Sequence, residues 1–292
     1  MTAPAGLRLA GHVVLASRPL SWINTAHPFA MAYLLSTREV DLALVVGTLF
    51  FLFPYNLLMY GVNDVFDHAS DVANPRKGGA EGAVLPRSVH RVTLLAAVGV
   101  SVPCVAVLVA LGGPGSWLVL AFSLFAVLAY SVPGLRFKER PFLDSITSSV
   151  HFVSPVGYAL TLAGAGFTPQ VWAVLGGFGA WGVAAHAFGA VQDVIPDRVG
   201  GIRSIATQLG AAPTVRFAIG MWTLAGLLMI SAPWPAPLVA PLVVPYVALA
   251  APYVRLADRD SARANRGWRK FLMINYGVGF LITLLIIWYL LR

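Results

Sequence analysis

The chain has 292 residues, of which 58% are hydrophobic and only 11% are charged. Soluble domains carry about 25% charged residues, so an apolar excess of this size cannot be hidden in a water-soluble core. The composition therefore indicates an integral membrane protein that is in contact with the lipid bilayer. The formal charge of +8 does not indicate nucleic-acid binding, because the basic residues lie between long apolar runs, where they mark the ends of membrane spans.

Nine apolar runs are long enough to be membrane-spanning helices. The hydrocarbon core of a bilayer is about 30 Å thick and needs roughly 20 apolar residues per helix. The predicted spans cover residues 20–36, 42–63, 91–111, 116–133, 146–164, 170–191, 214–232, 236–254 and 271–290. The first run is short and contains His27 and Pro28, so eight spans are the alternative if it only re-enters the membrane. The expected fold is all-α, a polytopic bundle of nine transmembrane helices in which residues 1–292 form a single domain.

The basic residues predict how these spans are oriented. Under the nine-span count, every Lys and Arg except Arg38 and Arg292 falls on one side of the membrane. The positive-inside rule makes that side cytoplasmic, which places the N-terminus in the cytoplasm and the C-terminus outside the cell. We expect a multi-pass protein of the cell (plasma) membrane without a cleavable signal peptide. The long loops 64–90 and 192–213 lie on the cytoplasmic side, so the active site is expected to open there.

A first acidic segment follows the second span. It reads Asn63-Asp64-Val65-Phe66-Asp67-His68-Ala69-Ser70-Asp71. If the helix continues through this segment, Asp64, Asp67 and Asp71 share one face, and Asn63 lies at the edge of that face. His68 points away from the acidic face and is expected to be a spectator.

A second acidic segment, Gln192-Asp193-Val194-Ile195-Pro196-Asp197, ends the sixth span. Asp193 and Asp197 are i, i+4 neighbours, although Pro196 is expected to distort that turn. A helix cap or a solvated loop explains one such Asp, but it does not explain two clusters that each follow an apolar run.

Both acidic segments need a ligand that offsets their charge. Carboxylates on one helical face repel one another, and they are costly at membrane depth. Mg²⁺ prefers hard oxygen ligands and is typically bound through one or two carboxylates together with substrate phosphates. The two segments therefore predict that Mg²⁺ is held by the five Asp residues, with a diphosphate group between the two clusters.

Basic residues close to these segments are candidates for binding the phosphates. Arg76 and Lys77 follow the first segment, Lys138 lies in the loop after the fourth span, and Arg203 follows the second segment. Arg binds phosphate through two parallel hydrogen bonds, and Lys acts as a point charge. In the same loops, Arg198 and Arg140 are explained equally well as determinants of membrane topology.

Three polar residues within or beside the spans have simple structural explanations. His151 and His186 lie inside the fifth and sixth spans, where packing with a hydrogen bond is expected. Asp144 opens the fifth span, where a carboxylate favours a helix N-terminus.

The paired acidic motifs, their positions after spans two and six, and the nine predicted spans resemble the UbiA superfamily of intramembrane prenyltransferases. The stretch from Tyr130 to Lys138 and the run Gly201-Ile202-Arg203-Ser204…Leu209-Gly210 are similar as well, so the resemblance covers essentially the whole chain. It implies that a prenyl group passes from an isoprenyl diphosphate to a lipophilic acceptor. It further implies that Mg²⁺ is bound by Asp64, Asp67, Asp71, Asp193 and Asp197. Implied substrate contacts are Asn63, Arg76, Lys77, Tyr130, Lys138 and Arg203.

A narrower likeness lies in residues 74–85, Asn-Pro-Arg-Lys-Gly-Gly-Ala-Glu-Gly-Ala-Val-Leu. This segment is similar to the lycopene elongases, which join five-carbon units to lycopene in the biosynthesis of fifty-carbon carotenoids. The likeness implies dimethylallyl diphosphate as the donor and lycopene as the acceptor. The residues agree in one respect, because no spare buried Arg or Lys presents itself to bind an aromatic carboxylate.

Two alternatives stay open at this point. One is an aromatic acceptor from a quinone, tocopherol or chlorophyll-type pathway. The other belongs to a different class, a secondary transporter, because acids inside the membrane also mark ion pathways.

Overall fold

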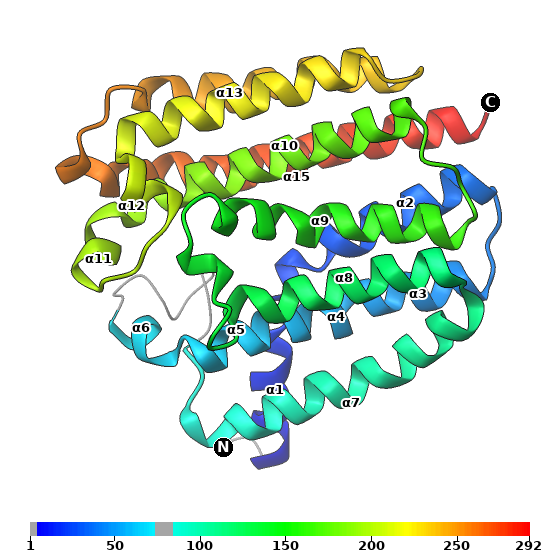
Figure 1. The fold of residues 1–292 in the computed structure, drawn as a ribbon, viewed down its shortest axis with the longest axis horizontal. Helices are drawn as coiled ribbons and strands as arrows, with labels where there is room; N and C mark the ends of the chain where they lie inside the picture. The colour runs from blue at the N-terminus through cyan, green and yellow to red at the C-terminus, as the bar shows by residue number, and fades with distance from the viewer. Residues whose placement is uncertain (1–4, 74–83) are drawn as a thin grey trace. The chain divides into compact units, whose positions relative to one another are not determined.

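The computed structural model describes residues 5–73 and 84–292, and within these ranges the regular structure is entirely helical (Figure 1). Seven helical stretches of the described residues are long and apolar enough to cross a membrane: Leu42–Phe66, Arg87–Leu111, Pro114–Ser131, Pro169–Val199, Ala211–Ile230, Ala236–Tyr253 and Asp258–Leu290. Each coincides with one of the predicted spans. The prediction of an all-α, polytopic membrane protein is therefore confirmed.

The other two predicted spans coincide with helices of a different character. The run 20–36 corresponds to α2 (Ile23–Thr37), which has only 15 residues. The run 146–164 corresponds to α9 (Leu143–Leu162), which is 20 residues long but carries buried polar side chains such as Asp144, Thr147 and His151. The count of nine spans stays a prediction.

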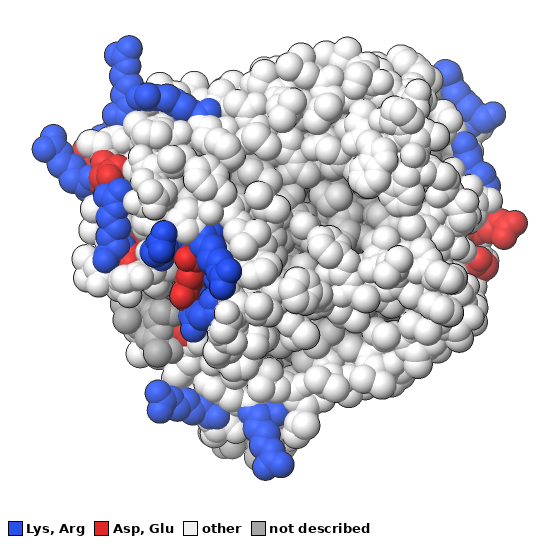
Figure 2. Space-filling model, in the orientation of Figure 1, with Lys and Arg blue, Asp and Glu red and all other residues white. Residues whose placement is uncertain are grey.

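The surface has the character expected for contact with lipid. Most of the face seen in Figure 2 carries no Lys, Arg, Asp or Glu. Large apolar side chains on the spans point outward, including Leu118, Met273 and Phe280, which are 73%, 72% and 63% exposed. Apolar exposure on this scale marks a surface that is covered by lipid or by another partner.

The helices fall into two compact units. The first comprises Met1–Arg136 and Ser154–Ala165, and the second comprises Phe137–Val153 and Gly166–Arg292. Helix α9 contributes its N-terminal part to the second unit and its C-terminal part to the first. One acidic segment lies in each unit.

The first unit is built around aromatic rings. Phe29, Phe51, Tyr55 and Tyr158 are fully buried and pack against one another with ring centroids 5.0–6.0 Å apart. Any side chain at Gly47 would overlap the Phe29 ring, so glycine permits this close approach. Besides α2, the helices of this unit are α1 (Ala5–Ala16), η1 (Pro19–Ser21), α3 (Leu42–Leu52), α4 (Pro54–Asn56), η2 (Leu57–Gly61), α5 (Val62–Phe66), α6 (His68–Ala73), α7 (Arg87–Leu111) and α8 (Pro114–Ser131).

The second unit packs around Trp222, which is fully buried among Phe188, Tyr246 and Phe271. Helix α10 lies beside both α13 and α15 (Figure 1). Besides the first part of α9, the helices are η3 (Phe137–Glu139), α10 (Pro169–Ala190), η4 (Val191–Asp193), α11 (Val194–Val199), α12 (Ile205–Leu209), α13 (Ala211–Ile230), η5 (Ala236–Val243), α14 (Val244–Ala250), η6 (Ala251–Tyr253), η7 (Asp258–Arg263) and α15 (Ala264–Leu290).

Candidate functional site

The first acidic segment is preceded by a π-helical turn. The turn Leu57–Gly61 interrupts the α-helical geometry of the stretch Leu42–Phe66 and leads directly into α5, which carries Asn63 and Asp64. Single π-helical turns inside α-helices occur frequently at functional sites. They change the direction in which the following side chains point.

The sequence prediction was conditional on a helix that continues through the acidic segment, and the structure interrupts this helix at Asp67. This residue ends α5 with φ −97° and ψ −1°, and α6 begins at the next residue. The i→i+4 hydrogen bonds continue on both sides, from Asp67 N to Asn63 O and from Asp71 N to Asp67 O, each 2.9 Å long. The chain therefore bends at Asp67 while keeping its helical course.

The three acids of this segment lie on its buried side. Asp64, Asp67 and Asp71 are 1%, 7% and 6% exposed, whereas Phe66 and Val72 are exposed. This agrees with the expectation that the three carboxylates share one face. A buried carboxylate is stable only with hydrogen bonds and an opposite charge close by.

Two guanidinium groups supply that charge in the first unit. Arg18 Nη2 donates to Asp64 Oδ1 at 2.8 Å, and the Arg18 guanidinium also lies 4.3 Å from the centre of the Tyr60 ring. Arg136 Nη2 lies 3.5 Å from Asp67 Oδ1. Burial is the largest effect and disfavours the charged guanidinium, but Asp64, Tyr60 and Asp71 together outweigh it and raise the pKa of Arg18 above its ordinary value.

Both of these arginines have an unusual backbone conformation. Arg18 has φ 51° and Arg136 has φ 41°, in the left-handed region that favours glycine. Arg18 also precedes Pro19, and a residue in that position normally adopts an extended conformation. A non-glycine residue in such a conformation costs on the order of 1–3 kcal/mol and tends to occur at functional sites.

Sequence reasoning missed these two contacts. Arg18 and Arg136 were counted only as charges that set the orientation of the spans. The only signal in the sequence was their position at the end of an apolar run. This signal was weak, because membrane topology alone places basic residues there.

The other predicted residues of the first unit lie near the end of α8. Ser131, the last residue of α8, donates from Oγ to Asn63 Oδ1 at 2.8 Å, which fixes the Asn63 side chain. Tyr130 precedes Ser131 and is partly buried. Arg76 and Lys77 lie outside the described residues.

The second acidic segment has the same local geometry as the first. Asp193 ends η4 with φ −97° and ψ 0°, and α11 begins at the next residue. Each segment thus places one Asp in the bridge region of the backbone map between two short helices, a conformation that many active-site residues adopt. Asp193 and Asp197 are partly buried. Pro196 lies in the first turn of α11, where its missing N–H is tolerated, so the bend falls at Asp193 instead.

The segment after Asp197 turns tightly before α12. Gly201 has φ 69°, a conformation that glycine adopts without strain. Ser204 caps α12 by accepting a hydrogen bond from the N–H of Thr207 at 3.2 Å. Arg203 is exposed in this turn, and Lys138 lies partly buried in η3. Their predicted contact with phosphate stays a prediction.

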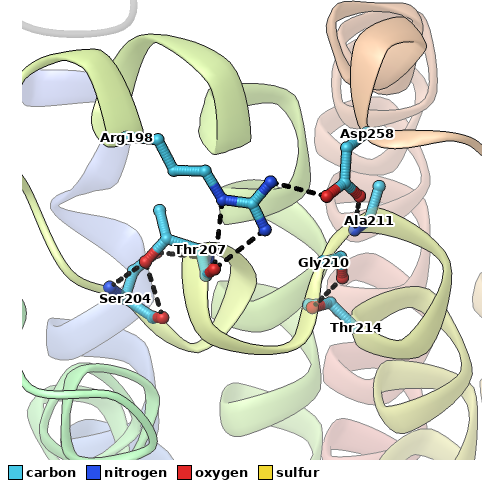
Figure 3. A network of polar contacts seen from close by, with 7 residues as sticks. All are labelled: Arg198, Ser204, Thr207, Gly210, Ala211, Thr214 and Asp258. Carbon is cyan, nitrogen blue, oxygen red and sulfur yellow. Dashed lines mark hydrogen bonds and ion pairs between the residues drawn. The ribbon is translucent and has the colours of Figure 1, made fainter.

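Arg198 makes contacts within the protein. The sequence alone could not decide whether this residue binds phosphate or only sets the membrane topology. Its Nε and Nη2 donate to Thr207 O at 3.2 and 2.9 Å, and its Nη1 donates to Asp258 Oδ2 at 2.6 Å (Figure 3). Asp258 in turn accepts from the N–H of Ala211 at 2.7 Å, so it caps α13 from η7. This network of hydrogen bonds connects α11, which carries Asp197 of the second acidic segment, to α12, α13 and η7.

Replacing Asp258 by Ala should destabilise the second unit. The change removes the acceptor for the first N–H of α13 and the partner of Arg198, and loss of such a cap costs about 1–2 kcal/mol. Thermal unfolding of the purified protein in detergent should show a lower midpoint. Asp260→Ala is the matched control, because Asp260 lies in the same short helix and its carboxylate pairs with the neighbouring, exposed Arg259 at 3.8 Å. Equal midpoints for D258A and D260A would contradict this prediction.

The carboxylate oxygens of the acidic segments are suitable magnesium ligands when a substrate completes the coordination. Carboxylate oxygens are the ligands that Mg²⁺ prefers. Within residues 5–73 and 84–292, no three His, Cys, Asp or Glu side chains converge into a complete metal cluster. Mg²⁺ commonly takes only one or two carboxylates and completes its coordination with substrate phosphates and water. The residues therefore fit an ion that binds together with a phosphorylated substrate.

Comparison with known proteins identifies the class of this chain. The UbiA prenyltransferase family matches residues 26–289. The chain therefore belongs to the UbiA prenyltransferase family, and it is a membrane-embedded prenyltransferase. This excludes the secondary transporter that the intramembrane acids left open.

Within the family, the chain is similar to proteins of carotenoid biosynthesis. It is 53% identical over 93% of its length to the C(50) beta-cyclic carotenoids biosynthesis protein LbtBC of Dietzia sp., although it spans only 63% of that protein. It is 47% identical to the lycopene elongase/hydratase of Corynebacterium glutamicum, covering 94% of this chain and 96% of that one. The lycopene elongase/hydratase of Haloferax volcanii is 33% identical, over 95% of this chain and 89% of the relative.

Solved structures share the fold. A UbiA homologue from Archaeoglobus fulgidus bound to DMAPP and Mg²⁺ matches with a TM-score of 0.66 and 15% identity, covering 91% of this chain and 98% of that chain. A digeranylgeranylglyceryl phosphate synthase matches with a TM-score of 0.63 and 13% identity, over 94% of this chain and 96% of that one. At these identities the likeness concerns the fold alone.

Proposed function

We propose that this prenyltransferase transfers a dimethylallyl group from its diphosphate to lycopene, as a step toward fifty-carbon carotenoids. The observation that carries the proposal is the nearly full-length likeness to a lycopene elongase/hydratase, at 47% identity. The names of two further relatives, at 33% and 53% identity, also refer to lycopene elongation or to the biosynthesis of C50 carotenoids. An apolar acceptor suits the chain, because a hydrocarbon needs no charged group to hold it.

The donor is assigned to the acidic segments. Asp64, Asp67 and Asp71 of the first segment and Asp193 and Asp197 of the second are proposed to bind the magnesium diphosphate. The support is their charge, the burial of the first three, and a shared bend at Asp67 and Asp193. A structural relative in complex with DMAPP and Mg²⁺ adds to this support. Bound magnesium would act as a Lewis acid on the diphosphate oxygens.

The side chains around the acids are proposed to bind and orient the donor. Asn63 is held in place by Ser131, and Tyr130 lies next to it in the chain. The proposed substrate contacts are Asn63, Arg76, Lys77, Tyr130, Lys138 and Arg203. The basic members stabilise the negative charge that develops on the diphosphate as the carbon–oxygen bond breaks, and such electrostatic stabilisation usually contributes more to catalysis than any other effect. The allylic cation that results is attacked by a terminal double bond of lycopene.

The cellular placement is proposed from the charge distribution. We propose that the protein is embedded in the plasma membrane through nine spans, as a single domain with the N-terminus in the cytoplasm and the C-terminus outside. The donor site then opens to the cytoplasm, where a soluble diphosphate is available. The positive-inside pattern of the loops supports this placement.

Product mass tests this function directly. Membranes containing the protein are incubated with lycopene, dimethylallyl diphosphate and Mg²⁺, and the pigments are separated and weighed by mass spectrometry. The expected products carry one or two additional five-carbon units, and they disappear when a chelator removes the magnesium. Unchanged lycopene, with prenylation of an added aromatic acceptor instead, would replace the proposed function with the aromatic alternative.

A further inference from the structure

A buried polar cluster in the second unit has no part in the reaction as described so far. It consists of Asp144 and Ser145 at the start of α9, His151 two turns later, and His186 on α10. Asp144, Ser145 and His151 are at most 3% exposed, whereas His186 as a whole residue is partly exposed. Within this cluster, His186 is therefore the residue with the most exposed surface.

The cluster is arranged around the imidazole of His186. Ser145 Oγ lies 3.0 Å from His186 Nδ1. Asp144 attracts a protonated His186 electrostatically, although burial of the imidazole opposes its charge and is the larger effect. Asp144 Oδ2 accepts from the N–H of Ile205 at 2.8 Å, while its Oδ1 is buried and has no hydrogen-bond partner among the described residues. A buried carboxylate in this state is stabilised when a positive charge forms beside it.

The position of His186 relates it to the second acidic segment. Helix α10 continues directly into η4, and His186 precedes Asp193 by seven residues, which corresponds to about 10 Å along a helix. On the far side of His186 from Asp193, Ser149 and Val183 line an apolar pocket of about 190 Å³. His186 thus lies between a segment assigned to the diphosphate and an apolar space suited to a hydrocarbon.

The proposed reaction leaves one proton unassigned. The donor carbon–oxygen bond breaks with its electron pair on the diphosphate, and a double bond of the acceptor supplies the pair for the new carbon–carbon bond. The other carbon of that double bond becomes a cation. A carbon–hydrogen bond next to it then breaks, its electrons form a new double bond, and the proton must go to a base.

We infer that His186 is the base that accepts this proton, with Asp144 and Ser145 as its positioning residues. When Nδ1–H donates to Ser145 Oγ, Nε2 carries no proton and can take one up. The imidazolium that forms is stabilised by Asp144, as a carboxylate stabilises the protonated histidine of other catalytic sites. The inference rests on the proposed function, because a proton is released only if the acceptor is prenylated at carbon.

The test measures two products of one reaction. Diphosphate release and prenylated lycopene are measured in the same assay, and their ratio is compared between wild type and His186→Gln. Without the base, the acceptor cation reverts, and water captures the donor cation as a five-carbon alcohol. The ratio of prenylated lycopene to diphosphate should then fall by about tenfold or more. A purely structural role changes the amount of active enzyme and leaves the ratio unchanged.

The same cluster provides a matched control. His151→Gln removes a histidine that is also buried and close to His186, and it should keep the wild-type ratio. Asp144→Asn should lower the ratio as well, because the imidazolium loses its counter-charge. A wild-type ratio in H186Q, or an equal fall in H151Q, overturns the inference. If H186Q releases no diphosphate at all, Ser145→Ala decides, since it deletes one hydroxyl: a lower ratio supports the inference and a wild-type ratio overturns it.

Failure of the inference is distinguishable from failure of the proposed function. If the wild type adds no five-carbon unit to lycopene, the proposed acceptor is wrong, whatever the variants do. The ratio can then be measured with the acceptor that the wild type does use. If the wild type elongates lycopene and H186Q keeps its ratio, only the assignment of the base is wrong.

Discussion

Replacing Asp193 by Asn should lower the rate of prenyl transfer on the order of a hundredfold, which corresponds to about 3 kcal/mol of lost transition-state stabilisation. Asn keeps the size of the side chain and one oxygen, but it removes the charge that is proposed to hold magnesium. Asp193 is only partly buried, so the change should cost little stability. The measurement is the initial rate of diphosphate release at saturating donor, over a range of Mg²⁺ concentrations.

The dependence on magnesium makes this result specific. If Asp193 binds the metal, the concentration of Mg²⁺ that gives half-maximal rate should rise in D193N. Asp260→Asn is the control, because it removes one acid of similar exposure outside both motifs and should behave as wild type. A D193N enzyme with a wild-type rate and an unchanged magnesium requirement would remove Asp193 from the site.

Replacing Arg18 by Gln should destabilise the first unit by about 3 kcal/mol. The Asp64 side chain has no exposed surface and lies 2.8 Å from the Arg18 guanidinium, so the variant removes this counter-charge from a buried carboxylate. Removing one partner of a buried pair costs far more than the pair itself contributes, because the remaining charge stays desolvated. The midpoint of thermal unfolding, measured in detergent without donor or magnesium, should fall accordingly.

A double-mutant cycle separates stability from function at this pair. Asp64→Asn combined with Arg18→Gln removes both charges, so the double variant should recover much of the stability lost in R18Q. It should not recover activity, because Asp64 is also assigned to the magnesium diphosphate. If D64N fails to rescue the unfolding midpoint of R18Q, the Arg18–Asp64 contact is not what stabilises the α1–α2 connection.

The spans could be predicted because the bilayer imposes their length and composition. Seven apolar runs of about 20 residues became seven long helices, including those that carry both acidic segments. The predicted run 146–164 does coincide with a helix, α9, but the polar residues of α9 are explained only once the fold buries them. Asp144 is an example, since it contacts Ile205, 61 residues away along the chain.

The acids of the candidate site could be predicted because their pattern is local. Asp64, Asp67 and Asp71 are close in sequence, so helix periodicity alone suggests that they share a face. Their counter-charges could not be predicted in this way. Arg18 is 46 residues from Asp64, and it reaches that carboxylate from a left-handed backbone conformation before a proline. Such a contact depends on the packed structure, and nothing in the local sequence distinguishes Arg18 from a topology charge.

The π-helical turn Leu57–Gly61 acts as a one-residue insertion in the helix that leads to the first acidic segment. If this turn became regular α-helix at unchanged chain length, everything after it would rotate by about 100°. Asp64 and Asp67 would then leave the buried side that they now occupy, although no acid had been changed. The direction of these carboxylates is thus encoded in the spacing of the chain as well as in the identity of its residues. A relative with all three acids but one residue fewer before them would present them on the same side from an uninterrupted α-helix.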